Sequence, residues 1–354
     1  MRVPRRCTLL ACGAGGAGAL APAGKPLFRF GVIGDVQYAN VDDGLNYIGT
    51  RTRRYRQSLS ILEEAAAAWG AAGVDFCVEL GDIVDGQART ARAETLNDLN
   101  GAMNRAKVGK WHIPPGNHEL YVFGRPELHA SLLSRAPGPD ELYYSFSPAP
   151  GWRCLVLDSY ELSVIGAVGG TSGRRASAEL LAQHNPNINA DEPNAPSKGG
   201  WLQGMDRKNF RWVPYNGGFS DKQLSWFERT LESAQATGER VCVFCHSPVH
   251  EEASKPHNLP WNYEKILEAL DRKKGVVQLF FAGHDHDGGF ASRGGSEFHI
   301  TPPAPLECEV GEKAYGRVDV YDDRAVLNWC GKTPIKSKDP WPSELFFAEA
   351  KQPA

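Results

Sequence analysis

Acidic, amide and imidazole side chains recur in this sequence immediately after short apolar runs. The positions concerned are Asp35, Gln37, Asp82, Asp85, Asn117, His118, His246, His284 and His286. Oxygen and nitrogen donors without thiolates suit Mn, Fe, Zn or Mg-like ions better than soft metals. A single Asp after a strand is most often a turn former or helix cap, so it is the repetition of the pattern that indicates divalent-metal chemistry.

The elements that carry these side chains are predicted from hydrophobic patterning. Apolar runs lie at 27–33, 74–80, 111–113, 240–245 and 276–282. Such runs, rich in β-branched or aromatic residues and ended by turn formers, predict strands. Sites of α/β sheets lie just past strand ends. We therefore expect the polar side chains to meet at one edge of the sheets.

Helical patterns separate the predicted strands. They cover 52–69, the region around Leu96–Met103, a segment that Ser220 and Gln223 open as a capping box, and the region around Ile266–Leu270. After Phe290 the chain turns to short alternating segments at 298–301, 316–321 and 325–329, which predict antiparallel strands. This order favours an α/β fold with layers around two packed sheets.

The motifs, taken in chain order, resemble a known family. The blocks are Asp35-x-Gln37, Gly81-Asp82-x-x-Asp85, Gly116-Asn117-His118-Glu119, His246 and Gly283-His284-x-His286. This set resembles the five motif blocks of the calcineurin-like metallophosphoesterases. The resemblance implies an α/β fold of the metallophosphoesterase type, an α/β/β/α sandwich of two packed mixed sheets flanked by helices.

The resemblance also implies a site for two divalent cations, bridged by Asp82. Site one would take Asp35, Gln37, Asp82 and His286. Site two would take Asp82, Asn117, His246 and His284. Mn²⁺ is the expected ion, with Zn²⁺, Fe²⁺ or Mg²⁺ as alternatives. Asp85 is expected to orient a ligand or the backbone by hydrogen bonding.

His118, which follows the Asn117 ligand directly, is the candidate catalytic residue that the resemblance implies. Two cations lower the pKa of a bound water toward neutrality, so that hydroxide can attack phosphorus in line with the leaving oxygen. His118 would then protonate the leaving group or stabilise the transition state. The alternative is a structural hydrogen bond near the metals.

One departure from the wider family points to a narrower one. Most members have His at the position of Gln37, and an amide oxygen is a harder donor that favours Mn(II). The stretches at 31–38 (GVIGDVQY), 43–50 (DGLNYIGT), 216–220 (NGGFS) and 282–289 (AGHDHDGG) are similar to the manganese-dependent ADP-ribose/CDP-alcohol diphosphatases, which share this Gln. The similarity implies an enzyme that hydrolyses the diphosphate bond of ADP-ribose, CDP-choline or related CDP-alcohols to a nucleoside monophosphate and a phosphorylated product.

Two residues are candidates for substrate contact. Tyr47 could stack on a nucleobase, although a packing role is equally compatible with the sequence. Arg53 could contact a diphosphate, whereas Arg51 and Arg54 stay undecided between that role and a solvated helix start.

Alternative functions remain open at this point. A broad phosphodiesterase or phosphomonoesterase for cyclic nucleotides or simple esters would use the same metals. A metal-free scaffold should lack several of the donors, yet every position has one.

The chain divides into a leader at 1–26, a metallophosphoesterase domain at 27–334 with an insertion at 160–218, and a tail at 335–354. The insertion is rich in Gly, Pro, Asn and Ser with interspersed aromatic residues. A connection this long is usually functional or disordered. The aromatic residues favour a structured cap beside the site.

Composition limits partners and location. A net charge of -3 argues against nucleic acid as a partner, and no apolar run past the leader is long enough to cross a membrane. We expect a small nucleotide conjugate as ligand and a monomer by default. Cysteines inside apolar runs favour the cytoplasm, with export through a twin-arginine-like signal around Arg5 and Arg6 as the alternative.

Overall fold

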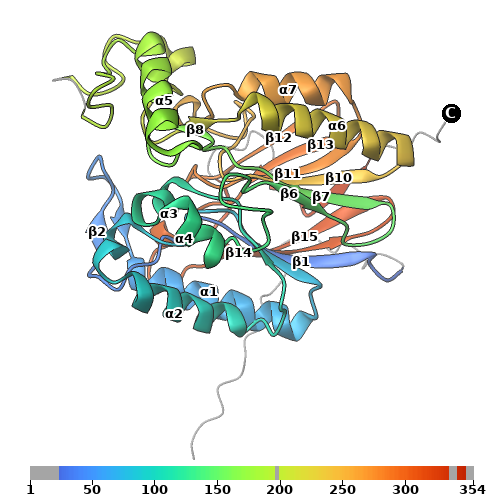
Figure 1. Ribbon diagram of the computed structural model, residues 1–354. Coiled ribbons are helices and arrows are strands. Elements are labelled where there is room, and N and C mark those ends of the chain that lie inside the picture. Colours follow the sequence, from blue (N-terminus) through green and yellow to red (C-terminus); the bar gives the residue numbers. More distant parts are fainter. Residues whose placement is uncertain (1–23, 196–198, 335–340, 348–354) are drawn as a thin grey trace, which may run out of the picture.

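Two six-stranded sheets pack face to face at the centre of the molecule (Figure 1). The computed structural model describes residues 24–195, 199–334 and 341–347. The first sheet has the order β16 (Glu344–Phe346), β15 (Arg324–Gly331), β14 (Ala314–Val320), β1 (Phe28–Ile33), β4 (Phe76–Glu79) and β5 (Trp111–His112). The second sheet has the order β12 (Gly289–Arg293), β13 (Glu297–Thr301), β11 (Val277–Phe281), β10 (Arg240–Phe244), β7 (Trp152–Val156) and β6 (Tyr144–Phe146).

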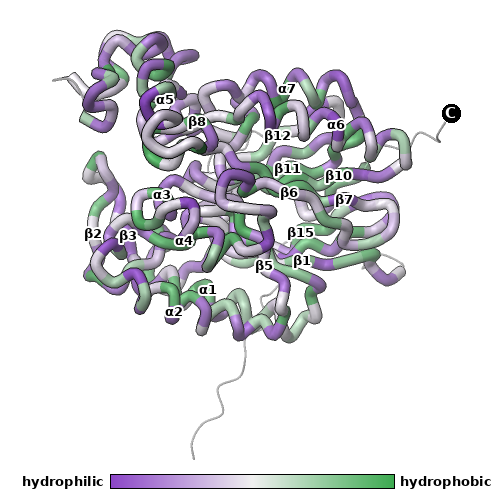
Figure 2. Tube along the Cα trace, viewed as in Figure 1, coloured by the Kyte–Doolittle hydropathy of each residue, from purple (hydrophilic) through white to green (hydrophobic). Residues whose placement is uncertain are grey.

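Aromatic side chains fill the space between the sheets. Phe30 of β1 stacks on Phe76 of β4 with ring centroids 5.2 Å apart. It meets Phe244 and Phe281 of the opposite sheet edge-on, each at 5.5 Å. Because strand side chains alternate between faces, the other side chains of these strands point outward to the helices. The strands therefore appear largely hydrophobic in Figure 2, as expected when both faces are covered.

Helices cover both outer faces (Figure 1). On the first sheet lie α1 (Tyr55–Ala72) and α2 (Arg92–Asn104), and on the second lie α6 (Asp221–Thr237) and α7 (Tyr263–Arg272). The shorter helices are α3 (Asn117–Val122), α4 (Arg125–Ala130) and the 3₁₀ helices η1 (Gly86–Thr90), η2 (Arg207–Asn209), η3 (Pro256–Asn258) and η4 (Pro305–Glu307). The observed layers are the predicted α/β/β/α sandwich. Among the described residues, no helix is long and apolar enough to span a membrane.

The capping box predicted at the start of α6 is half formed. The Ser220 side chain accepts a hydrogen bond from the Gln223 backbone N–H. The Gln223 side-chain oxygen does not accept from the Ser220 N–H, however, because it accepts from the Asp158 N–H at 2.9 Å, and Glu161 accepts from the Ser220 N–H instead. The second half of the box is thus replaced by a buried contact between α6 and the segment after β7.

The insertion at 160–218 folds into a small layer of its own. It contains β8 (Leu162–Ser163), α5 (Gly170–His184), η2 and β9 (Gly217–Gly218). Its core consists of Val164, Ala178, Leu181, Ile188 and Trp212, closed by Trp261 from outside the insertion. Across from it lies the hairpin of β2 (Gly44–Leu45) and β3 (Thr52–Arg53), as Figure 1 shows. The expectation of a structured cap agrees with this arrangement.

The domain extends beyond the predicted boundary at 334. Strand β16 pairs antiparallel with β15 and buries Leu345 in the core between the sheets. Trp341 and Phe347 pack against the same core. Burial of these apolar side chains holds the segment at the sheet edge. Most of the predicted leader, residues 1–23, and the remainder of the predicted tail lie outside the described residues.

Candidate dinuclear metal site

The predicted metal donors meet at the carboxyl ends of five strands. Strands β1, β4 and β5 are mutually parallel in the first sheet, as are β7, β10, β11 and β13 in the second. The loops that follow β1, β4, β5, β10 and β11 therefore open at one edge. Backbone hydrogen bonds join them: Asp35 N–H donates to Gly81 O at 3.1 Å, Gln37 N–H to Asp82 O at 2.7 Å, and Gly283 N–H to His246 O at 2.8 Å.

The backbone at these loop positions is unusual. Asp35, Gln37, Asp82 and His284 have φ angles of 54°, 43°, 61° and 66°. Among the described non-glycine residues, only Lys107 shares the left-handed region with them. Such conformations cost of order 1–3 kcal/mol each and cluster at functional sites. Tight turns are what aim these side chains back at one another across the sheet edge.

Two glycines of the motifs are required by close approach. A Cβ on Gly81, which has φ of +89°, would lie 2.6 Å from Nδ1 of His246. A Cβ on Gly116 would lie 2.2 Å from Oδ1 of Asp82. Glu119, also in the third motif, accepts backbone hydrogen bonds from Asp82 and Gly116 at 2.9 and 2.8 Å. This buried carboxylate holds the second and third loops together.

Four donor atoms of site two face one another. His246 Nδ1–H donates to Leu80 O at 2.9 Å, so its Nε2 faces the cluster and is the nitrogen that can take up either a proton or a metal cation. That Nε2 lies 3.4 Å from Asp82 Oδ2, 3.3 Å from Asn117 Oδ1 and 3.2 Å from His284 Nδ1. Lone pairs at these separations repel unless a cation lies among them.

The orientation of His284 is fixed by Asn216. The Asn216 Nδ2 amino group donates to the carbonyls of Arg211, His257 and Leu259 at 2.9, 2.8 and 3.0 Å. Its Oδ1 must therefore be the atom that faces His284 Nε2 at 2.8 Å, and His284 must carry its proton there. The Nδ1 atom of His284 is left bare toward Asp82 and His246.

Site one shows the same pattern. His286 Nδ1–H donates to Glu307 Oε1 at 2.9 Å, which leaves Nε2 bare at 3.6 Å from Asp35 Oδ1. The Gln37 amide lies at this Nε2 (2.9 Å) and at Asp82 Oδ2 (3.3 Å). Its Oε1 is buried without a hydrogen-bond partner among the described residues. A half-turn of the Gln37 amide, which exchanges the positions of Oε1 and Nε2, would place the oxygen toward the cluster.

Electrostatics agree with a cation site. Burial opposes the charged form of His246, but the negative charges of Asp82 and Asp35 outweigh it and raise the pKa of His246 to about 9. Burial is also the largest influence on Asp82, yet the surrounding imidazoles hold its pKa well below the usual value. The cluster thus attracts positive charge strongly. Asp82, His246 and His284 offer donor atoms within 4.8 Å of one another, and oxygen and nitrogen donors of this kind would suit a divalent cation.

His118 and Asp85 lie beside this cluster. The His118 backbone N–H donates to Asp82 Oδ1 at 2.7 Å. Its Nδ1 accepts from the Gly86 backbone N–H at 3.1 Å and lies 3.0 Å from Asp85 Oδ2, which pairs with the imidazole when the ring is charged. Burial lowers the pKa of His118, but Asp82 and Asp85 raise it by more, so the net shift is upward. Asp85 also caps η1 through Gln87 N–H at 2.8 Å.

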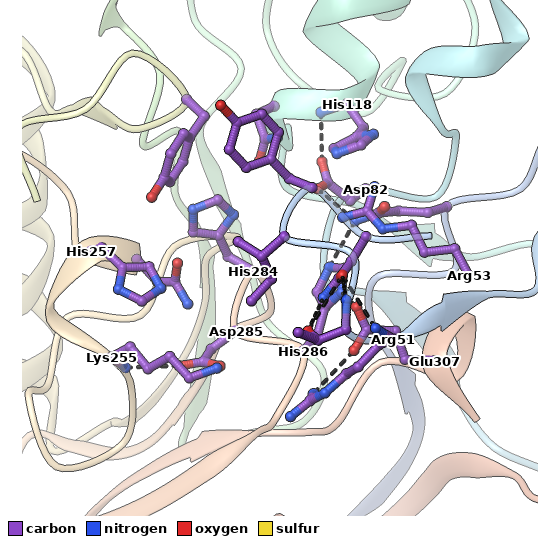
Figure 3. A pocket seen from close by; sticks show the side chains of 18 of the residues that line it. Arg51, Arg53, Asp82, His118, Lys255, His257, His284, Asp285, His286 and Glu307 are labelled. Atoms are coloured by element: carbon purple, nitrogen blue, oxygen red, sulfur yellow. Dashed lines mark hydrogen bonds and ion pairs between the residues drawn. The ribbon is translucent and has the colours of Figure 1, made fainter. Parts of the chain in front are cut away.

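A cavity of about 480 Å³ opens onto these side chains (Figure 3). Arg53 lines it, with Nη1 at 3.9 Å from Asp85 Oδ2 and with its Nε lacking a hydrogen-bond partner among the described residues. Tyr47 of the hairpin and Trp201 of the insertion also line it. Their rings are nearly parallel, with centroids 6.1 Å apart, and Tyr47 is 82% exposed.

Other residues behave differently from the predictions or were missed. Arg51 is tied to Asp287 and Glu307, and Arg54 to Glu309, so both arginines form ion pairs within the protein. No role was predicted for Asn216, Glu119 or Glu307. Glu119 and Asn216 did carry a signal, as the last residue of the third motif and the first residue of the stretch 216–220, whereas Glu307 carried none.

The fold and this constellation define a metal-dependent phosphoesterase. Residues 28–288 match the model of the calcineurin-like phosphoesterase family, and the chain belongs to that family. The predictions of the family and of its fold are confirmed.

Within the family, the chain is similar to the manganese-dependent ADP-ribose/CDP-alcohol diphosphatases. That of Danio rerio is 38% identical over 320 residues, covering 87% of this chain and 96% of its own length. That of Homo sapiens is 35% identical over 333 residues, covering 89% and 94%. The crystal structure of a dimetal phosphatase from Danio rerio has a TM-score of 0.82 at 37% identity and covers 92% of this chain and 100% of its own.

Proposed function

We propose that this protein hydrolyses the diphosphate bond of nucleoside diphosphate conjugates such as ADP-ribose and CDP-alcohols. The observation that carries the proposal is that one cavity holds the metal donors, an arginine and a pair of aromatic rings. A nucleotide conjugate needs all three kinds of contact. The names of the relatives, which specify ADP-ribose and CDP-alcohol, support the same substrate class.

Two divalent cations, Mn²⁺ by the names of the relatives, would supply a water of lowered pKa and neutralise charge on the phosphoryl oxygens. His118 holds a proton at the edge of the cluster, with Nδ1 anchored by Asp85. Its Nε2 is then available to the oxygen that leaves phosphorus, as general acid or as a hydrogen-bond donor to developing charge.

Arg53 supports binding of the second phosphate. At 3.9 Å its contact with Asp85 is longer than a charge-assisted hydrogen bond, so the planar guanidinium keeps donors free for a phosphate. Arg53 and His118 line the same cavity, which supports a contact of Arg53 with the phosphate of the leaving group. Arg51, in contrast, has its Nη1 engaged by Asp287 and Glu307.

Tyr47 and Trp201 support binding of the nucleobase. Aromatic rings offer a face on which any base can stack, and this explains how one pocket could accept both adenine and cytosine conjugates. The cavity of about 480 Å³ lies in the range of about 300–1,000 Å³ that small-molecule sites occupy.

A substrate panel tests the proposal. Turnover of ADP-ribose, CDP-choline, a cyclic nucleotide and an aryl phosphate would be compared with Mn²⁺ and with Mg²⁺. We expect the two diphosphates to have the highest kcat/KM, and Mn²⁺ to be the better ion. If the aryl phosphate or the cyclic nucleotide were much the best substrate, the broad esterase alternative would replace this proposal. A metal-free scaffold is disfavoured, because every predicted donor has reached the cluster.

The protein's partners and location are also proposals. We propose a small-molecule enzyme that acts as a monomer and does not bind nucleic acid, in line with the net charge of -3. We propose the cytoplasm as its compartment, because Cys77, Cys154, Cys242, Cys245 and Cys308 are buried free thiols. Immunoblotting of fractionated cells tests this, and a processed form outside the cytoplasm would favour the export alternative.

A further inference from the structure

Glu307 is a buried carboxylate that connects metal site one to an arginine. It ends the 3₁₀ helix η4 and lies beyond the segment 28–288 that matches the family model. Its Oε1 accepts from His286 Nδ1–H at 2.9 Å, and its Oε2 accepts from Arg51 Nη1 at 3.1 Å. Only 4% of its side chain is exposed and 14% of that of His286, so water screens this contact little, whereas Arg51 is 37% exposed. Figure 3 shows the three side chains joined in this order.

The other two ligand imidazoles have neutral partners. His246 donates to the backbone carbonyl of Leu80 at 2.9 Å, and His284 donates to the Asn216 side-chain oxygen at 2.8 Å. Of the three imidazoles, His286 is the one backed by a full negative charge. A carboxylate on the far nitrogen fixes the tautomer of a metal-binding histidine and makes its free nitrogen more basic.

Arg51 keeps Glu307 in place. Its Nη1 contacts both Glu307 and Asp287, the residue after His286. Asp287 is held from its other oxygen by Lys255 Nζ at 2.5 Å. His286 is therefore held through its ring by Glu307, and the residue after it, Asp287, is held by Arg51 and Lys255. Arg51 precedes β3 of the hairpin that presents Tyr47, which ties the cavity wall to the metal loop.

We propose that Glu307 and Arg51 are positioning residues for His286, and that they make site one the tighter of two unequal cation sites. Site one has the carboxylate of Asp35 as a donor and Glu307 behind His286, whereas site two has the neutral Asn117 and neutral partners behind both imidazoles. At limiting Mn²⁺ the protein holds one ion at site one, and the second ion enters at higher concentration. The inference rests on the proposed function in one respect: the division of the donor residues between two cation sites is taken from it.

Titration of Mn²⁺ into the chelator-treated full-length protein tests the proposal, with free Mn²⁺ followed by electron paramagnetic resonance. We expect a tight and a weaker binding class in the wild type. Glu307→Gln keeps the volume and removes the charge, so the tight class should weaken by about 10- to 100-fold while the weaker class stays unchanged. Glu309→Gln is the matched control, because Glu309 is a carboxylate two positions along that pairs with Arg54 and contacts no ligand.

Arg51→Met separates orientation from net charge. If Arg51 acts by holding Glu307, its loss weakens the tight class, whereas an effect of charge alone would strengthen Mn²⁺ binding and overturn the part assigned to Arg51. A single binding class in the wild type, unchanged binding in Glu307→Gln, or equal weakening of both classes would each overturn the proposal. The substrate panel is independent of these titrations, so failure of the diphosphatase function would appear there alone.

Discussion

Asp85 Oδ2 lies 3.0 Å from Nδ1 of His118, and the two side chains are only 3% and 14% exposed. The carboxylate anchors one ring nitrogen and leaves the other for the cavity. We expect His118→Ala to lower kcat by about 100- to 10,000-fold with little change in Mn²⁺ affinity, because His118 contributes no donor to the cluster. Steady-state kinetics together with Mn²⁺ titration measures both, and near-normal turnover would rule out the catalytic role.

Asp85→Asn provides the companion measurement. It keeps the size of the side chain but removes the charge that helps to raise the pKa of the His118 imidazole. A general acid loses activity as pH rises through its pKa. The decline of kcat at high pH should therefore begin at lower pH in the variant than in the wild type. An unchanged pH profile would argue against His118 as the group that titrates.

Removal of metal should lower thermal stability. Asp35, Asp82, Glu79 and Glu119 are all fully or nearly fully buried, and burial raises the pKa of Asp35 to about 6. A ligand present at 100 times its Kd stabilises the folded state by about 2.7 kcal/mol. We expect chelation to lower Tm by several degrees, and Mn²⁺ to restore it.

Asp82→Ala is the control for that experiment. Because the bridging carboxylate is lost, this variant should show no rise of Tm on addition of Mn²⁺ and no measurable hydrolysis. Persistent activity in Asp82→Ala would contradict the dinuclear site. Scanning calorimetry with and without chelator gives both comparisons.

Truncation of the aromatic pair should affect binding more than chemistry. Base–aromatic stacking is worth about 1–3 kcal/mol per base, so Trp201→Ala or Tyr47→Ala should raise KM about 5- to 150-fold with a small effect on kcat. Val310→Ala removes another highly exposed apolar side chain, 83% exposed and outside the cavity lining, and should change neither constant. A fall in kcat alone would place the rings in the catalytic step instead.

His112 should make the fold sensitive to mild acid. Its ring is 4% exposed and stacks on Phe146 with centroids 3.8 Å apart. Burial, helped by Arg135 and Lys110, lowers its pKa to about 3. When the pH is below about 6.5, the ordinary pKa of histidine, His112 binds a proton in the unfolded chain but not in the folded chain. Stability is therefore complete above pH 6.5 and falls by up to about 1.4 kcal/mol per pH unit as pH drops toward 3.

Urea unfolding at pH 7.5 and pH 5 measures the contribution of His112 to the free energy of unfolding. In His112→Phe the stack on Phe146 can persist but the proton uptake cannot. The stability advantage of the wild type over the variant should shrink by about 2 kcal/mol between the two pH values. A constant difference would show that His112 titrates normally in the folded protein.

The sequence was sufficient to predict the ligand cluster because each donor follows a strand directly. Asp35, Asp82, Asn117, His246 and His284 each come within a few residues of a strand end, and parallel strands align their ends. Cys242 and Cys245, three positions apart, belong to cores on the two sides of the second sheet, as alternation along a strand requires.

Other features could not be predicted from the sequence, because they depend on tertiary contacts. Strands β6 and β12 were not predicted, and β16 fell within the predicted tail, because short or half-polar segments at a sheet edge give little periodic signal. Arg51 could not be assigned from sequence, since its acidic partners lie more than 230 positions away. The roles of Asn216 and Glu307 are set by which imidazole nitrogen they contact, and the stretch 216–220 that contains Asn216 did not indicate that contact.

The separate apolar core of the insertion has a practical consequence. Val164, Leu181 and Trp212 pack with one another and with Trp261 rather than between the two large sheets. Changes in this layer can therefore remodel the wall that carries Trp201 while the cation cluster keeps its geometry. Within the insertion, Tyr160 and Asn216 contact Asn117 and His284. The architecture is suited to laboratory evolution of new specificity, in which libraries confined to the insertion, with these two residues kept, would vary ligand choice and leave the hydrolytic machinery intact.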